Sequence, residues 1–204
     1  SGFSQKQPDR RCLLCAGDIC EEESKYEEAI SNFKRVMELS KSDLAGTSAI
    51  AIADINVKEG QFDAALNLYN VIIKNHSNLE HLIYPKIAEV YRNMNKYEEA
   101  LEFYSKSLTV VPARQMAQIQ FKIAETKEAK GEKDEAIEEY LKVTYLYSEN
   151  NQLNVKSLLR IAAIYEDKEN FKEARSAYKK IISMNVEEAK YAQERIDWIE
   201  AHNK

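Results

Sequence analysis

The chain has 204 residues, 44% of them hydrophobic and 31% charged, so it can bury a sizeable core, and an intrinsically disordered chain is excluded. Its five glycines and three prolines are too few for the many tight turns of an all-β sandwich or barrel, so the composition favours helices. The formal net charge of −5 provides no long-range attraction to nucleic acid or anionic lipid, and no apolar run reaches the roughly 20 residues of a membrane span.

The first predicted helix contains all three cysteines of the chain, Cys12, Cys15 and Cys20. Cys12 and Cys15 form a CxxC pair, but no second pair and no nearby histidine completes the four ligands of a zinc site. We therefore expect no metal site, and we expect the cysteines to be small apolar side chains that pack in this helix. Three free thiols also favour a reducing compartment such as the cytoplasm.

One helical pattern then recurs five times, at intervals of 35 to 38 residues. Each copy has a small residue with a bulky residue three positions before it and an aromatic residue four positions after it, which places all three on one helix face. The small residues are Ala29, Ala65, Ala100, Ala136 and Ala174. The residues before them are Tyr26, Phe62, Tyr97, Lys133 and Phe171, of which only the lysine breaks the pattern, and the following aromatics are Phe33, Tyr69, Tyr104, Tyr140 and Tyr178.

A second helix precedes each of these, because another small residue lies twelve positions earlier in every copy. These residues are Gly17, Ala53, Ala88, Ala124 and Ala162. Between the two helices, Gly60, Asn95 and Gly131 suit the left-handed conformation that ends a helix. Ser24 and Glu169 occupy that place in the outer copies and suit it less, so we expect those two turns to differ in detail.

The last stretch of the chain predicts one further helix. It carries apolar residues at helical spacing, Ala189, Ala192, Ile196 and Ile199. A lone helix at this place could cover the last repeat as a cap.

This arrangement resembles the tetratricopeptide repeat, a helix–turn–helix unit of about 34 residues with small residues at two contact points. The resemblance implies an all-α fold, a right-handed α-α superhelix or solenoid of about eleven helices with no strands. It implies a single solenoid domain over residues 1–204. The expected repeats span about 10–40, 43–75, 79–109, 112–147 and 151–184, and the expected capping helix spans 187–202.

No group of residues in the sequence indicates catalysis. The glycines are isolated, so no phosphate-binding loop can form, and we expect the histidines His76 and His81 to be solvated beside a loop. We therefore expect no enzyme activity and no cofactor. An RNA-binding pentatricopeptide array, whose period is also near 35 residues, is disfavoured by the acidic charge balance.

In the resembled family, the first helix of each unit lines a concave groove that binds a partner. Here an apolar row would line it, comprising Leu14, Ile50, Pro85, Phe121 and Leu159. An acidic row would lie beside it, comprising Asp18, Asp54, Glu89 and Glu125. These rows suit an extended or helical protein segment with basic and hydrophobic side chains.

Two observations bear on this groove. Lys86 with Glu89, and Lys122 with Glu125, have the spacing of helical ion pairs, so the acidic row is alternatively a solvated, neutralised face. In the resembled family, some domains grip a carboxylate with Lys and Asn where this chain has Leu14 and Asp18, so a carboxylate clamp is disfavoured.

The sequence thus favours a non-enzymatic protein–protein interaction scaffold, with no nucleic-acid partner and no membrane insertion. The alternative is a structural self-assembly module, a homo-oligomer joined through its terminal repeats. Tyr191 and Trp198 flank the apolar stripe of the capping helix and either pack on the fifth repeat or form a self-association patch. The last two repeats also resemble those of bacterial cell-envelope tetratricopeptide proteins, so localisation stays open between the cytoplasm and the periplasm or cell envelope.

Overall fold

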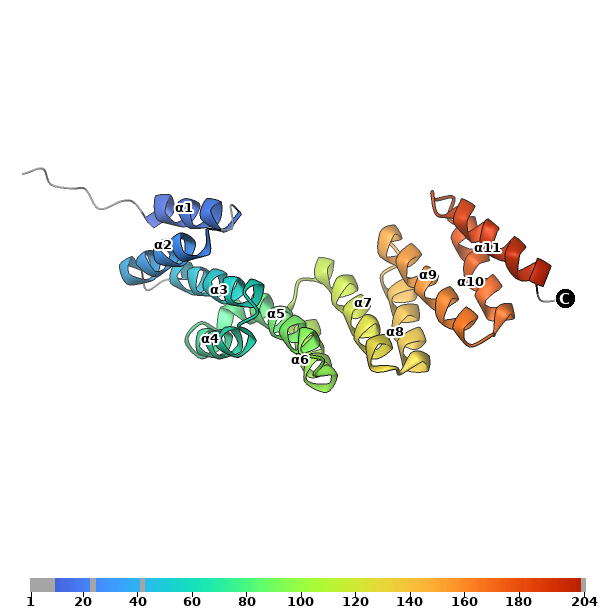
Figure 1. Cartoon of the computed structure of the whole chain (residues 1–204), viewed down its shortest axis with the longest axis horizontal. Coiled ribbons are helices and arrows are strands. Elements are labelled where there is room, and N and C mark those ends of the chain that lie inside the picture. Colours follow the sequence, from blue (N-terminus) through green and yellow to red (C-terminus); the bar gives the residue numbers. More distant parts are fainter. Residues whose placement is uncertain (1–9, 23–24, 41–42, 203–204) are drawn as a thin grey trace, which may run out of the picture. The chain divides into compact units, whose positions relative to one another are not determined.

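The computed structural model describes residues 10–22, 25–40 and 43–202. Within these ranges the chain forms eleven α-helices, one short 3₁₀ helix and no strand, which confirms the predicted all-α fold class (Figure 1). The chain divides into two compact units, residues 1–95 and residues 96–204.

The first unit contains five α-helices, each packed on the next along the chain. Their bounds are α1 (Arg10–Glu22), α2 (Tyr26–Leu39), α3 (Asp43–Lys58), α4 (Phe62–Asn75) and α5 (Glu80–Asn93). The stretch between α4 and α5 is not a loop as expected: it forms the 3₁₀ helix η1 (Ser77–Leu79), and His81 lies in the first turn of α5.

The second unit contains six α-helices, which likewise pack in chain order. They are α6 (Tyr97–Val110), α7 (Ala113–Lys130), α8 (Lys133–Leu146), α9 (Asn151–Asp167), α10 (Phe171–Ser183) and α11 (Ala189–His202). Helix α11 packs on α10 and contributes Ala192, Ile196 and Ile199 to the core of this unit. The helix expected to be a cap therefore buries its apolar stripe.

The small residues of the repeat lie where helices approach most closely. Nine alanines at the two small positions have no exposed surface: Ala29, Ala53, Ala65, Ala88, Ala100, Ala124, Ala136, Ala162 and Ala174. At the tenth position, a Cβ atom added to Gly17 would lie 2.6 Å from the ring of Phe33, so α1 and α2 are in contact there without room for a methyl group. The aromatics that follow the second-helix alanines are buried as well.

The turns within the repeats share one backbone conformation. Gly60, Asn95 and Gly131 have φ angles of 76°, 58° and 93°, as the sequence predicts. The expectation that Glu169 would form a different turn is wrong, because its φ angle is 55°. Two backbone hydrogen bonds, from Glu169 N to Glu166 O and from Asn170 N to Tyr165 O, both 2.8 Å long, hold the residue in this conformation despite its side chain. Ser24 lies outside the described residues.

Candidate partner-binding pocket

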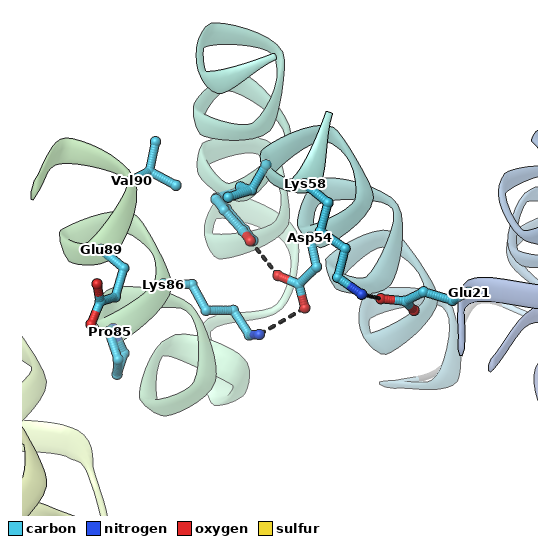
Figure 2. A pocket seen from close by; sticks show the side chains of 9 residues that line it. Glu21, Asp54, Lys58, Pro85, Lys86, Glu89 and Val90 are labelled. Atoms are coloured by element: carbon cyan, nitrogen blue, oxygen red, sulfur yellow. Dashed lines mark hydrogen bonds and ion pairs between the residues drawn. The ribbon is translucent and has the colours of Figure 1, made fainter. Parts of the chain in front are cut away.

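The first unit contains a pocket of about 470 Å³ between α1, α3, α4 and α5 (Figure 2). Its lining residues are Glu21, Asp54, Val57, Lys58, Tyr69, Pro85, Lys86, Glu89 and Val90. Three of the groove candidates from the sequence, Asp54, Pro85 and Glu89, are among them. The pocket thus combines an apolar wall with three carboxylates and two lysines.

Asp54 of α3 is the most connected side chain in the pocket. One carboxylate oxygen accepts a hydrogen bond from the hydroxyl of Tyr69 on α4, and the other accepts from Nζ of Lys86 on α5 at 2.7 Å (Figure 2). Burial and the nearby negative charge of Asp54 raise the pKa of Tyr69 above its ordinary value, so the phenol stays protonated and donates. Asp54 therefore joins three helices of the first unit.

A second ion pair joins α1 to α3 at the other side of the pocket. Nζ of Lys58 lies 2.7 Å from a carboxylate oxygen of Glu21 (Figure 2). The hydrogen bond to Glu21 raises the pKa of Lys58, so this lysine is protonated at neutral pH. The side chain of Lys58 is 47% exposed and that of Glu21 19%, so the cation can leave for solvent more easily than the carboxylate.

The pair between Lys86 and Glu89, which the alternative of a neutralised face suggested, does not form. Lys86 extends to Asp54, whereas Glu89 points away from Asp54 and lies 3.4 Å from Nε of Arg92 on its own helix (Figure 2). The physical reason is that the carboxylate of Asp54 is only 27% exposed and already accepts from Tyr69, so a cation is stabilised there more than beside an exposed neighbour. In the second unit, Lys122 pairs with Glu125 at 3.2 Å, as expected.

The second unit repeats the relationship between a tyrosine, a carboxylate and a cation. The hydroxyl of Tyr140 on α8 donates to Glu128 on α7 at 2.8 Å, and both Nε and Nη2 of Arg160 on α9 donate to the same carboxylate. Tyr140 is fully buried, so its hydroxyl requires an acceptor, and the carboxylate that serves as acceptor in turn requires a cation.

The last repeat also combines a tyrosine, a carboxylate and a cation, and here the cation belongs to the capping helix α11. Nε of Arg195 on α11 donates to Glu166 on α9 at 3.2 Å. Burial and then a hydrogen bond to Glu166 raise the pKa of Tyr178 above its ordinary value. We call this arrangement the tyrosine–carboxylate–cation triad, present as Tyr69–Asp54–Lys86, Tyr140–Glu128–Arg160 and Tyr178–Glu166–Arg195.

The triad was not predicted from the sequence, although the repeat contains a signal for it. Lys86 and Arg160 lie fourteen residues before Ala100 and Ala174, and Arg195 lies one period, 35 residues, after Arg160. A cation therefore recurs at one repeat position, and Lys86, Arg160 and Arg195 each bind a carboxylate of the preceding repeat. At the position of the tyrosine, the first repeat has Phe33, which has no hydroxyl that needs a hydrogen-bond acceptor.

The remaining groove candidates lie outside the pocket. Ile50 and Phe121 are 6% and 7% exposed, and Leu14 and Leu159 pack against the hydrophobic cores of their units. These four side chains offer little surface to a partner because a helix in a stacked array has neighbours on two sides. Asp18 is exposed on α1.

The cysteines do not all pack as expected. Cys15 is exposed, because Leu13 and Gly17 form the buried face of α1 and a residue between them points to the opposite side. Cys20 is half-buried, and the side chain of Cys12 lies outside the described residues. No cluster of three or more His, Cys, Asp or Glu side chains suited to a metal ion occurs in the part of the chain that the structure describes. None of the helices in this part has the length and apolar character needed to cross a membrane.

Known proteins share both the sequence pattern and the fold. A model of the tetratricopeptide repeat matches residues 83–113, 117–150 and 155–185. The chain is similar in structure to MamA, with 17% identity and a TM-score of 0.67 over 89% of this chain and 94% of that one. It is also similar to BtubC (BKLC) from P. vanneervenii, with 16% identity and a TM-score of 0.71 over 92% of this chain and 80% of that one.

A third similar structure is YrrB, a tetratricopeptide-repeat protein described as having an unusual peptide-binding site. It shares 15% identity and a TM-score of 0.62 over 91% of this chain and 92% of that one. Identities this low establish a common fold and nothing further. No curated protein sequence matches the chain.

Proposed function

The chain belongs to the tetratricopeptide-repeat family, and on that premise we propose that it is a non-enzymatic scaffold that binds a protein or peptide segment in the pocket of its first unit. The observation that carries this proposal is the composition of the pocket wall. Val57 and Pro85 provide apolar surface. The three carboxylates of the wall each pair with a partly exposed cation, Lys58, Lys86 or Arg92. A segment with hydrophobic and basic side chains complements such a wall.

The two lysines define how a basic side chain enters. Lys58 and Lys86 are 47% and 38% exposed, and each has a long flexible stem that can swing its ammonium group into water. An incoming guanidinium can then replace one of them at Glu21 or Asp54. Because one ion pair replaces another, the net gain from charge is small, and the affinity depends mainly on the apolar contacts.

Glu89 offers the most direct test of the pocket. It lines the pocket, its side chain is 37% exposed, and it is not a member of the triad that holds α3, α4 and α5 together. We would capture partners on the immobilised protein, identify the bound segment, and titrate that segment against the wild type and Glu89→Lys. Glu38→Lys is the matched control, because Glu38 is exposed on α2 of the same unit and does not line the pocket.

The proposal predicts that Glu89→Lys loses the segment and Glu38→Lys retains it. Equal affinities of the two variants for the segment would show that the segment does not bind in the pocket. The far-ultraviolet circular dichroism of both variants should match the wild type, which separates a binding defect from unfolding.

A second function, self-assembly, is favoured by aromatic side chains on α11. Tyr191 and Trp198 are 51% and 44% exposed. The ring of Trp198 is stacked on that of His202 at 4.6 Å, and the guanidinium of Arg195 lies 4.7 Å from its centre. Such a patch on a terminal helix can stack on another copy of the chain. Light scattering across a range of concentrations tests it: self-assembly predicts a concentration-dependent oligomer that Trp198→Ser abolishes, and a monomer throughout excludes it.

A further inference from the structure

The second unit carries a basic surface over α8, α9 and α10, far along the chain from the pocket of the first unit. Three adjoining depressions of about 480, 360 and 160 Å³ form it. Lys180 borders all three, and Tyr145 and Leu158 border the latter two. We call this region the α8–α10 surface.

The charge of the α8–α10 surface is opposite to that of the whole chain. Four cations line the depressions, Lys172, Arg175, Lys179 and Lys180, and Glu173 is the only carboxylate among the lining residues. Arg175 lies 3.3 Å from Glu200, but within the described ranges no carboxylate forms an ion pair with Lys172 or Lys179. A positive patch persists here on a chain whose net charge is −5, so the complementary ligand is acidic.

A buried acceptor that has no hydrogen-bond donor among the described residues lies beside this surface. Asn154 lines the 360 Å³ depression and is 5% exposed. Its Nδ2 donates to the carbonyl oxygen of Ser148 at 2.9 Å, which fixes the orientation of the amide, and its Oδ1 accepts no hydrogen bond from the described residues. An unpaired buried acceptor destabilises the protein, and a ligand with an N–H group would supply the missing donor. Every non-proline residue of a peptide backbone carries such a group.

An exposed aromatic side chain borders two of the depressions. Tyr145 is 68% exposed, and its neighbour Leu146 is 64% exposed. The ammonium of Lys180 lies 5.5 Å from the centre of the Tyr145 ring and 3.4 Å from its hydroxyl, so the aromatic and basic groups are adjacent. Below them, Leu141, Leu158 and Ile161 provide an apolar floor to the smallest depression. A ligand there combines acidic and apolar groups.

We propose that the α8–α10 surface binds an acidic peptide segment of a partner protein. Its carboxylates lie beside Lys179 and Lys180, one backbone N–H donates to Oδ1 of Asn154, and an apolar side chain packs on Tyr145. This site takes the opposite charge from the pocket of the first unit. The two sites therefore bind different segments, and either can fail its test without affecting the other.

The probe is a fluorescein-labelled peptide of Glu and Leu, titrated by fluorescence anisotropy against the whole chain. A peptide with Lys in place of every Glu is its charge-inverted counterpart. The test variant is Lys179→Glu/Lys180→Glu. The control is Lys156→Glu/Lys190→Glu, which makes the same charge change at two exposed lysines of the same unit that border none of the depressions.

The expected result is binding of the acidic peptide that weakens roughly tenfold in the test variant and less than about twofold in the control. Asn154→Leu should also weaken binding, and backbone N-methylation at one peptide position should weaken binding to the wild type but not to Asn154→Leu. Should Asn154→Leu unfold, the exposed double variants still decide the proposal. Glu89→Lys, in the first unit, should bind the acidic peptide as the wild type does.

Several outcomes would overturn the proposal. Equal losses in the test and control variants would indicate general charge attraction, and equal binding of the Lys/Leu peptide would exclude charge recognition. Binding to phosphatidylserine vesicles that the test variant abolishes, without binding of the acidic peptide, would assign the surface to membrane lipid. A dimer that only the test variant dissociates, again without peptide binding, would assign it to a second copy of this chain.

Discussion

Tyr140 on α8 donates a hydrogen bond to Glu128 on α7, with 2.8 Å between the hydroxyl and the carboxylate oxygen. Arg160, which lies 32 residues after Glu128 in the chain, binds the same carboxylate. The pair thus satisfies a hydroxyl within one repeat, and the arginine joins that repeat to the next. Asp54, a carboxylate that the sequence suggested as a ligand for a partner, likewise holds adjacent repeats together through Tyr69 and Lys86.

Tyr140→Phe tests the hydrogen bond of this triad. The substitution keeps the ring and removes only the hydroxyl, so the free energy of unfolding should fall by about 1.5–3 kcal/mol, the typical contribution of a hydrogen bond to a charged group. Urea unfolding followed by circular dichroism measures the change. Tyr145→Phe is the control, since the hydroxyl of Tyr145 is on an exposed side chain, and it should change stability by less than about 0.5 kcal/mol. Equal stability of wild type and Tyr140→Phe would show that the bond contributes nothing.

The raised pKa values of Tyr69, Tyr140 and Tyr178 predict how the free energy of unfolding changes at alkaline pH. Burial keeps the proton on each phenol in the folded state, whereas an unfolded tyrosine loses it near pH 10. The folded state therefore binds more protons above that pH, so the free energy of unfolding is unaffected below about pH 10 and decreases as the pH rises further. Urea midpoints across the alkaline range measure this. Tyr140→Phe should lose stability less steeply, and an identical slope in both proteins would contradict the account.

A feature of the fold or of the pocket could be predicted from the sequence when the residues that form it lie close together along the chain. The buried alanines and tyrosines follow from spacing within one helix, so the repeat predicted them. The partner of Lys86 depends on a carboxylate 32 residues earlier and on the geometry between helices, and neighbouring residues in the sequence suggested Glu89 instead. The exposure of Cys15 could have been predicted, because its place on the helix wheel is opposite Gly17.

Glu169→Gly should stabilise the chain, since Glu169 has a φ angle of 55°, where a side chain is strained. Glycine adopts this conformation readily, and Gly131 occupies the corresponding place in the preceding repeat. The gain should be about 0.5–1 kcal/mol, reduced by the greater freedom of glycine in the unfolded chain. Thermal unfolding measures it. Glu138→Gly, on an exposed position inside α8, should instead destabilise by about 1 kcal/mol, and a loss of stability in Glu169→Gly would refute the strain.

Gly17→Ala tests the close contact between α1 and α2. In an open helix this substitution stabilises by about 1 kcal/mol, because alanine has the higher helix propensity. Here the added Cβ would lie 2.6 Å from the ring of Phe33, which is fully buried and cannot move away freely, so we expect a net loss of about 1–3 kcal/mol in urea unfolding. The sign of the change thus distinguishes a crowded contact from an open one. Combining Gly17→Ala with Phe33→Leu should cost less than the sum of the two single changes, because the smaller side chain makes room for the methyl group. Additive losses, or a stabilised Gly17→Ala, would mean that the two helices are not in contact at this position.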